Sequence, residues 1–494
     1  MNGPLRRLGT VVGAMFALLL VAATYVQFVD AGDLQADGRN SRTFYAELGR
    51  ARGPITVGDQ PIAESVEVDD RYSYQRTYPD GPTYAHVTGA YSVVYGASGL
   101  EAAEEELLSG TDDSLFYRRL SDLLTGREPA GAVVETSIVP EVQQAAAEAL
   151  GGQRGAAVAL DPRTGEVLAL VSSPSYDPNA LAGHDTGAVR AAREELLADE
   201  ARPLENRAIA SFLYPPGSVF KLVTAAAALQ AGYAPDSALA GPAVLDLPQT
   251  EQGLRNSDRA ACGPNDQTTL ADALRTSCNT AFASVGMALG EGALRDAAAG
   301  FGFGEELAIP LEVTPSTVPT GMDAPSLAQA AIGQRNVRVT PLQVAMVSAG
   351  IANDGVVMAP TLVRSVRGED LEVIRAPSPT ELGRALSAED AEALTQMMVG
   401  VVADGTGRAA RIDGVEVAGK TGTAQHEPGR PPHAWFTAFA PADDPVVAVA
   451  VVVEDGGDAG DQASGGRTAA PVAREMIQAQ LDRVAQDAAA QGDG

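Results

Sequence analysis

The order of strand-like and helix-like segments is the feature that most constrains the fold of this chain. Two apolar runs, 156–160 and 166–171, flank a Pro- and Gly-containing turn at 161–165, and this pattern predicts a β-hairpin. Helical patterns then dominate residues 217–400. The other strand-like runs come only after them, at 415–424, 434–440 and 446–453, before a last helix at 469–486. This order predicts an α+β fold, with an antiparallel sheet flanked by helices beside a helical subdomain.

The rest of the chain supplies the expected domain limits. Residues 30–153 read as a small mixed domain of short strands and Gly/Pro turns, ahead of a main domain at 154–487. Residues 488–494 are rich in Ala, Gly and Asp and are expected to be a disordered tail. We expect helices at 99–108, 114–124, 139–150, 218–231, 270–289, 326–331, 341–352 and 388–402.

The N-terminus predicts a membrane segment. Arg6 and Arg7 precede an uncharged apolar run at 8–29, which is about long enough to span a bilayer. Basic residues on the N-terminal side favour a cytoplasmic segment at 1–7 and an extracytoplasmic remainder. A cleaved signal peptide, ending at the small residues 21–23, is the alternative. An uncleaved anchor is favoured because the run is long for the apolar core of a signal peptide.

Charge excludes one class of partner. The formal net charge is -29 at pH 7. Such an acidic chain is not expected to bind nucleic acid or an anionic membrane surface as its main partner.

Lysine occurs only twice, as Lys221 and Lys420, and every other fixed positive side chain is arginine. Arginine serves as well as lysine for surface charge, but only a lysine amine can lose its proton and act as a base. Both lysines lie in short motifs, which favours a chemical role over a chance survival of lysine in an arginine-rich composition.

The first motif is Ser218-x-x-Lys221, placed after Pro215-Pro216-Gly217 at the start of an expected helix. Residues at i and i+3 share a helix face, so the hydroxyl and the amine can meet. Serine is a poor nucleophile without an adjacent base, and a neutral lysine can serve as one. Alone, this short pattern also occurs by chance in many proteins.

Two further motifs supply polar groups. Ser277-Cys278-Asn279 lies within the helix expected at 270–289 and offers a hydroxyl and a carboxamide. Lys420-Thr421-Gly422-Thr423 lies on an expected strand, where glycine would leave the strand edge open to a ligand. A bound peptide could pair with this edge and place its terminal carboxylate near these groups.

The two cysteines, Cys262 and Cys278, are predicted to form a disulfide, because an even pair in an exported protein often does. Two separate buried thiols are the alternative. No metal or organic cofactor is expected, since the four histidines lack a metal-ligand spacing and read as surface or structural residues. They are His86, His184, His426 and His433.

The order Ser-x-x-Lys, Ser-x-Asn, Lys-Thr-Gly, with gaps of roughly 60 and 140 residues, is far more specific than any of its parts. It is the motif set of class A β-lactamases and penicillin-binding proteins. By these residues the chain resembles a penicillin-binding protein. Cys278 stands where the β-lactamase form of the second motif has aspartate, which is compatible with the looser Ser-x-Asn of penicillin-binding proteins.

Further segments resemble the class B penicillin-binding proteins, and most of all their actinobacterial PbpA type. The latter likeness rests on the brevity of 30–150 and on the cysteine pair. The resemblance implies a penicillin-binding transpeptidase, serine β-lactamase-like fold, preceded by a pedestal or dimerisation-like domain. The class B segments are Arg52-Gly53-x-Ile55, 95–101, Gly333-Gln334, 340–343 and Trp435-Phe436.

The resemblance also implies a reaction, the cross-linking of D-Ala-D-Ala stem peptides of peptidoglycan. In it, Ser218 attacks the penultimate D-Ala carbonyl, Lys221 takes the serine proton, and Ser277 with Lys420 passes a proton to the leaving amine. Asn279 would hold the substrate amide. Thr421, Gly422 and Thr423 would bind the terminal carboxylate, and the backbone N–H groups of Ser218 and Thr423 would form the oxyanion hole. A neighbouring amine would then resolve the acyl-enzyme, and β-lactams such as penicillin would trap it.

Other functions stay open at this point. A serine β-lactamase or D,D-carboxypeptidase would share the motifs, and so would a non-catalytic β-lactam sensor or scaffold. The resemblance further implies docking of residues 30–153 to a SEDS-type glycosyltransferase or other cell-wall synthesis proteins, at the outer face of the cell membrane.

Overall fold

The computed structural model describes residues 2–28, 50–115 and 131–492, except Ser211, Glu369 and Leu371. Two compact units make up the chain, one from residues 1–51 and 65–75 and the other from 52–64 and 76–494. Part of the helix expected at 114–124 falls outside the described residues; within them, only a short 3-10 turn, Asp113–Leu115, is present.

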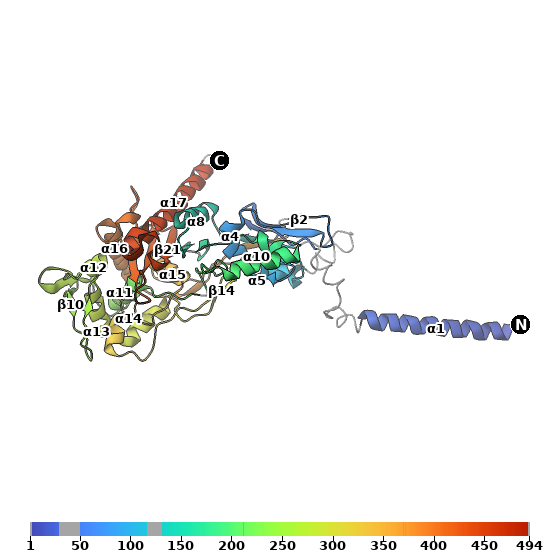
Figure 1. Cartoon of the computed structure of the whole chain (residues 1–494), viewed down its shortest axis with the longest axis horizontal. Coiled ribbons are helices and arrows are strands. Elements are labelled where there is room, and N and C mark those ends of the chain that lie inside the picture. The colour runs from blue at the N-terminus through green and yellow to red at the C-terminus, as the bar shows by residue number, and fades with distance from the viewer. Residues whose placement is uncertain are drawn as a thin grey trace. The chain divides into compact units, whose positions relative to one another are not determined.

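The first unit contains α1 (Asn2–Phe28), drawn in blue at the N-terminus in Figure 1. This helix is long and apolar enough to cross a membrane, and its described side chains are exposed. The segment expected at 8–29 is therefore helical as far as it is described.

The second unit is built on a five-stranded antiparallel sheet in the order β19-β20-β21-β7-β8. Hairpin strands β7 (Gly155–Leu160) and β8 (Val167–Ser173) join three strands that are some 250 residues further along the chain. These are β19 (Ala418–Ala424), β20 (His433–Ala440) and β21 (Val447–Val453). The α+β fold predicted from the segment order is confirmed, and β19 forms one edge of the sheet.

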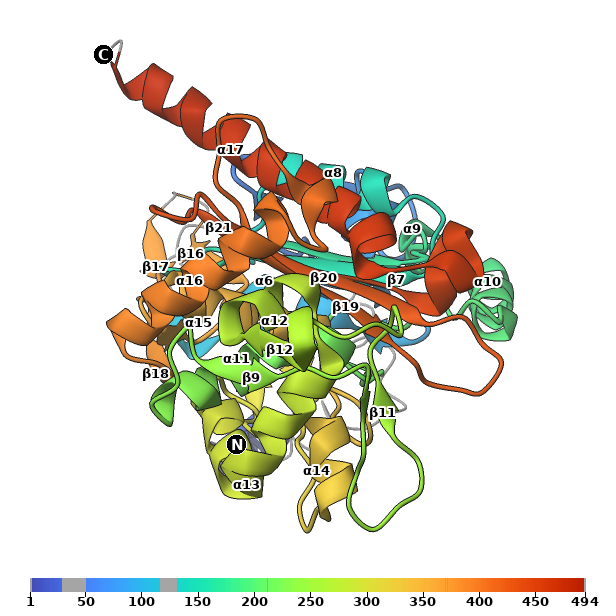
Figure 2. The same ribbon diagram turned by 90° about the vertical axis from the view of Figure 1, so that its left-hand side faces the viewer.

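Both faces of this sheet are buried, which explains the long apolar runs in β7, β8 and β21. Along β21, alternate residues contribute to two different hydrophobic clusters, with Ala448, Ala450 and Val452 in one and Val447, Val449 and Val451 in the other. Helices α8 (Pro140–Leu150) and α17 (Ala470–Gly492) cover the second face, while the helical subdomain lies on the first (Figure 2).

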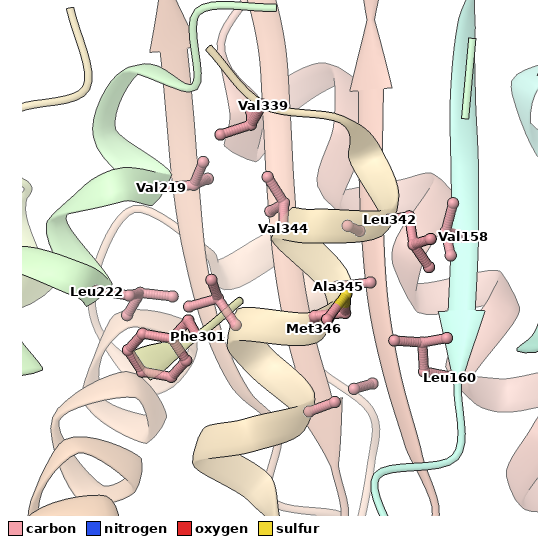
Figure 3. Close-up of a cluster of buried hydrophobic side chains, with 14 of the residues drawn as sticks. Val158, Leu160, Val219, Leu222, Phe301, Val339, Leu342, Val344, Ala345 and Met346 are labelled. Atoms are coloured by element: carbon pink, nitrogen blue, oxygen red, sulfur yellow. The ribbon is translucent and has the colours of Figure 1, made fainter. Parts of the chain in front are cut away.

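Helix α15 (Pro341–Ala352) forms the centre of the core on the first face. Leu342, Ala345 and Met346 are buried and lie beside Val158 and Leu160 of β7 (Figure 3). Thr340 caps this helix by accepting a hydrogen bond from the Gln343 N–H, which accounts for the sharp start of the helix after the preceding loop.

The helical subdomain follows the expectation with one exception. Its other helices are α11 (Lys221–Gln230), α12 (Leu270–Thr276), α13 (Asn279–Gly300), α14 (Ala324–Ala330) and α16 (Ala388–Ala403). The single helix expected at 270–289 is wrong, because the chain breaks at Ser277, whose φ is 61°. A left-handed residue ends α12, and α13 restarts two residues later.

A second sheet joins segments from both sides of the expected domain limit at 153/154. Strands β1 (Ile55–Val57) and β6 (Val133–Thr136) pair in parallel, and β6 pairs with β16 (Val363–Arg367), which pairs with β17 (Val373–Arg375). Strands β2 (Gln60–Glu67) and β3 (Tyr74–Thr77) complete the sheet, and their residues 60–64 and 76–77 belong to this unit. The expected contiguous domains therefore share a sheet.

A buried ion-pair network links the two N-terminal class B segments. Arg52 Nη2 lies 2.9 Å from Glu101 Oε2, and Arg76 Nε lies 2.6 Å from Glu101 Oε1. Glu101 is fully buried, so each of its oxygens needs such a partner. Glu101 lies in α5 (Gly99–Ala103), which is followed by α6 (Glu105–Leu108). A single helix was expected at 99–108, and the structure has these two short helices instead.

The expectation of a disordered tail at 488–494 is wrong for residues 488–492, which continue α17. Alanine and glutamine have high helix propensity, so this segment extends a helix that is already anchored by its buried first turns. Residues 493–494 lie outside the described residues.

Candidate active site

Ser218 lies on a 3-10 turn, Gly217–Phe220, that leads directly into α11. Gly217 has a φ of 54°, and a Cβ there would come within 2.6 Å of the Thr423 carbonyl oxygen. Only glycine allows this left-handed turn to approach β19 so closely. The Gly217 N–H donates to Gly333 O over 2.9 Å, so the turn is fixed on a second side. Ser218 is thereby held beside the edge strand.

Trp435 holds the segment that leads into this turn. Its indole Nε1–H donates to Pro215 O over 3.1 Å, and its side chain is fully buried in β20. Buried indole nitrogens usually need such a partner. This contact explains why a tryptophan follows the third motif in the sequence.

The Lys221 amine is fully buried and contacts the second motif. Its Nζ donates to Ser277 O over 2.7 Å and to Asn279 Oδ1 over 2.7 Å, and it lies 3.3 Å from Ser277 Oγ. Among the hydrogen bonds of the described residues, none joins Ser218 Oγ to Lys221 Nζ. The one-turn spacing of the first motif therefore places its lysine against the Ser-x-Asn segment.

The second motif occupies the break between α12 and α13 and not a helix interior. Ser277 takes the left-handed conformation there, and Asn279 is the first residue of α13. This conformation points the Ser277 hydroxyl toward both lysines. A regular helix through 270–289 would have separated Ser277 and Asn279 by about 200° around its axis.

Lys420 is the second fully buried amine, on β19. Its Nζ donates to Ser277 Oγ over 2.9 Å and to Thr421 O over 2.9 Å. Ser277 Oγ is thus shared by both lysines, and all three motifs meet around one hydroxyl.

Burial determines the charge of these amines. Desolvation, and secondly the positive charge of Lys420, hold the pKa of Lys221 well below its ordinary value. Desolvation lowers the pKa of Lys420 to about 7. Burial therefore favours the neutral, basic form of the Lys221 amine, and Lys420 titrates within the physiological range.

Glycine at Gly422 also has a packing role that the sequence did not reveal. A Cβ at this position would come within 2.8 Å of the Trp435 Cβ and 3.1 Å of the Pro216 carbonyl oxygen. The absent side chain makes room for the segment that leads to Ser218, and the expected approach of a ligand to Gly422 stays a prediction. Thr421 Oγ1 lies 2.6 Å from Thr406 Oγ1, whereas Thr423 is exposed.

These groups open onto a cleft of about 470 Å³. Both lysines lie behind its wall, and Asp258 is the one charged residue among the described residues that line it. The lining includes the motif residues Ser218, Ser277, Cys278, Asn279, Thr421, Gly422 and Thr423. The further lining residues are Asn256, Ser257, Asp258, Ala261, Cys262, Thr276, Ile332, Gln334, Thr406, Ser464, Gly465 and Gly466.

Comparison with known families agrees with this geometry. Residues 155–478 match the penicillin binding protein transpeptidase domain, and residues 52–134 match the penicillin binding protein A dimerisation domain. The peptidoglycan D,D-transpeptidase PbpA of Mycolicibacterium smegmatis is 48% identical over 97% of this chain and 99% of that protein. The chain belongs to the class B penicillin-binding proteins.

Two further matches support this membership. The Mycobacterium tuberculosis protein of the same name is 46% identical over 97% of this chain and 99% of its own length. A solved structure of M. tuberculosis penicillin-binding protein A, in a ceftriaxone acyl-enzyme complex, is 45% identical with a TM-score of 0.86. The match covers 88% of this chain and 100% of that one. The family and fold expected from the motifs are confirmed.

This penicillin-binding protein also uses Asn256, which sequence reasoning missed. The buried Asn256 Oδ1 accepts hydrogen bonds from the N–H groups of Asn279 and Thr280, over 2.9 and 3.1 Å, and so caps α13. Its Nδ2 donates to Pro242 O and Ala260 O. Asn256 lies in a loop 23 residues before the helix that it caps, so no local pattern marks it.

The disulfide expected between Cys262 and Cys278 is present, with Cα atoms 5.9 Å apart. It ties the loop around Cys262 to the second motif. The bond and Asn256 therefore hold the same wall of the cleft against the start of α13.

Proposed function

We propose that this class B penicillin-binding protein carries out peptidoglycan D,D-transpeptidation through an acyl-enzyme on Ser218. The proposal rests on one observation. The buried amines of Lys221 and Lys420 both contact Ser277 Oγ, and they lie behind a cleft that Ser218 lines. A buried lysine whose pKa is lowered can supply the base that a serine nucleophile needs.

The proposed proton path takes Lys221 as the base because its amine lies one helical turn from Ser218 in the first motif. As Ser218 Oγ attacks the penultimate D-Ala carbonyl carbon, Lys221 Nζ accepts the hydroxyl proton. The C–N bond to the terminal D-Ala then breaks, and a proton reaches the leaving amine from Lys420 through Ser277 Oγ. The products are free D-Ala and an ester on Ser218. An amine from a neighbouring stem peptide attacks this ester, forms the cross-link and restores the serine.

Backbone and side-chain donors complete the site. The N–H groups of Ser218 and Thr423 stabilise the developing oxyanion, and the Thr421 and Thr423 hydroxyls bind the terminal carboxylate. Asn279 Nδ2, which donates to Arg255 O over 3.1 Å in this structure, holds the substrate amide. β19 is an edge strand, so an extended peptide can pair along it.

Mass spectrometry after incubation with penicillin tests the nucleophile. We expect one long-lived adduct on Ser218, lost in Ser218→Ala and retained in the control Ser257→Ala, another hydroxyl on the cleft wall. An equal yield in Ser218→Ala would refute the assignment. Rapid loss of the adduct with turnover of penicillin would favour a β-lactamase instead.

For its location, we propose that α1 is a single-pass anchor with the catalytic part outside the cell membrane. Its length and composition, and the basic pair Arg6 and Arg7 before the apolar run, support this orientation. A cysteine-accessibility assay in intact cells tests it. An Ala485→Cys variant, exposed on α17 and with Cys262 and Cys278 bridged, should react with an impermeant thiol reagent, and protection until the cells are opened would reverse the topology.

We further propose that residues 30–153 form a pedestal that docks a SEDS-type glycosyltransferase, whose glycan product this enzyme would cross-link. The match of residues 52–134 to a dimerisation domain, and the position of all three motifs after residue 153, support a non-catalytic docking role, which exposed positions such as Val66 and Tyr95 can probe. Photo-cross-linking amino acids at these two positions should capture the glycosyltransferase in cells. The matched control is Leu197, exposed on α10 (Thr186–Ala198), and capture from Leu197 alone would contradict the proposal.

A further inference from the structure

Three strand ends bring His426, His433 and Asp455 together at one end of the main sheet. His433 begins β20 and pairs with Ala424, the last residue of β19, and His426 follows two residues after Ala424. Asp455 follows two residues after β21, whose last residue, Val453, pairs with Ala434. Residues distant in sequence are thus placed at one point by the register of the sheet.

Their polar atoms are close together and poorly satisfied. One ligand atom from each residue lies within 4.8 Å of the other two. His426 Nδ1, His426 Nε2 and Asp455 Oδ1 are buried and have no well-aligned hydrogen bond among the described residues. Buried polar atoms without partners are rare and point to a missing ion or water.

We propose that His426, His433 and Asp455 form a binding site for a divalent transition metal of the zinc class. Two imidazoles and one carboxylate are a ligand set that zinc takes, with a fourth position left for water. Magnesium and calcium prefer all-oxygen sites, so this set disfavours them. No step of the transpeptidase reaction needs the metal, and the site goes beyond the proposed function.

The distances are close to those of a metal site. His426 Nε2 lies 2.9 Å and His433 Nδ1 lies 4.0 Å from Asp455 Oδ1. Two ligands of a tetrahedral zinc ion lie about 3.3 Å apart, given bonds of about 2.0–2.1 Å. Adjustments of less than 1 Å in each of these two pairs would therefore reach that spacing.

The local backbone allows this adjustment. The two imidazole rings now stack, with centroids 3.9 Å apart, so one of them must turn for both lone pairs to meet a common ion. His426 belongs to the β19–β20 connection, whose residues 427–430 are exposed, whereas His433 lies in β20, so the turn is assigned to His426. His433 is buried and accepts a hydrogen bond at Nδ1 from the Asp455 N–H, over 3.1 Å, which the ion would displace.

Neighbouring charges leave one carboxylate oxygen available. Arg430 Nη1 lies 3.5 Å from Asp455 Oδ2, whereas both histidines approach Asp455 Oδ1. Glu454, the next acidic residue, is held by Arg154 and Arg207 and takes no part. Asp455 has a φ of 50°, a left-handed conformation that is uncommon outside glycine, and such outliers concentrate at functional sites.

The test measures metal binding on the full-length protein in detergent, purified without a histidine tag and stripped with a chelator. Competition with a chromogenic chelator should show one equivalent of Zn²⁺, and Co²⁺ should give the visible absorption bands of a low-coordinate site. His426→Ala and Asp455→Asn should each weaken Zn²⁺ binding at least about tenfold. Asparagine tolerates the left-handed backbone, so Asp455→Asn removes the ligand charge without straining the turn.

His184→Ala is the matched control, because His184 is a histidine outside the cluster. It should bind Zn²⁺ as the wild type does, and Zn²⁺ should raise the thermal unfolding temperature of the wild type and of this control alone. Failure of the folded wild type to bind one equivalent of Zn²⁺ would overturn the proposal. A His426–Asp455 ion pair would then explain why these side chains cluster. Unchanged binding in both cluster variants, with the metal-free unfolding temperature intact, would also overturn it.

Discussion

The buried Lys420 amine should cost the folded protein stability that a neutral side chain would restore. Its pKa falls from the ordinary value of 10.5 to about 7 on folding. The unfolded chain therefore binds a proton that the folded chain releases between these pH values. The resulting penalty is absent above about pH 10.5, grows as the pH falls, and becomes constant below about pH 7.

The magnitude follows from that change in pKa. At 1.36 kcal/mol for each pH unit, the penalty is about 4 kcal/mol at pH 7 and about 2 kcal/mol at pH 9. Lys420→Met removes it, but also removes the donor to Ser277 Oγ and Thr421 O, at a cost of about 1–3 kcal/mol. We expect Lys420→Met to be more stable than the wild type by about 1–3 kcal/mol at pH 7 and nearly equal to it at pH 9.

Urea unfolding of both proteins at the two pH values measures this difference. Titrations of groups other than Lys221, whose pKa Lys420 also lowers, largely cancel between the two proteins. Arg295→Met, an exposed cation exchanged on α13, should show no such pH dependence. A stability difference between Lys420→Met and the wild type that is the same at pH 7 and pH 9 would refute the reasoning. It would mean that Lys420 keeps its proton in the folded state.

Three other predictions concern the same site. Lys221→Arg should abolish penicillin acylation while the protein stays folded, since a guanidinium stays protonated and cannot act as a base; labelling at the wild-type rate would show that no base is needed at this position. Asn256→Ala should destabilise the protein by about 2–4 kcal/mol and slow acylation, because the first N–H groups of α13 lose their acceptor. Asn256→Asp, which keeps the acceptor, should recover part of both losses in urea unfolding and labelling. A thiol titration of the denatured, unreduced exported protein should find no free cysteine, and two thiols would contradict the Cys262–Cys278 bond.

The sequence predicted the main sheet well because its strands are buried on both faces. Continuous apolar runs such as 447–453 leave little choice of structure, and α15 carries its own cap signal in Thr340. The motif order also identified the family. Local sequence patterns were therefore sufficient to predict a helix or strand wherever the residues that define it lie within that element or next to it.

The misses share a different cause. The break at Ser277 depends on Asn256 and on the two lysines that surround its hydroxyl, all from distant segments. Gly422 makes room for the Pro216 carbonyl, over 200 residues away. The histidine cluster escaped notice because its third member, Asp455, arrives from another strand. Such contacts exist only after the chain has folded, so no local pattern could report them.

The sheet that joins β1 and β6 to β16 has a consequence for dissecting this protein into parts. Residues 363–367 find their hydrogen-bonding partner at 133–136, so the N-terminal region acts as a template that completes the catalytic half. Truncation at 153/154 would leave one edge of β16 without a hydrogen-bonding partner, and such unpaired strand edges promote pairing between molecules. The parts before and after 153/154 should accordingly unfold in one cooperative step. A destabilising substitution in the N-terminal, non-catalytic part should therefore also unfold the catalytic part and abolish its activity.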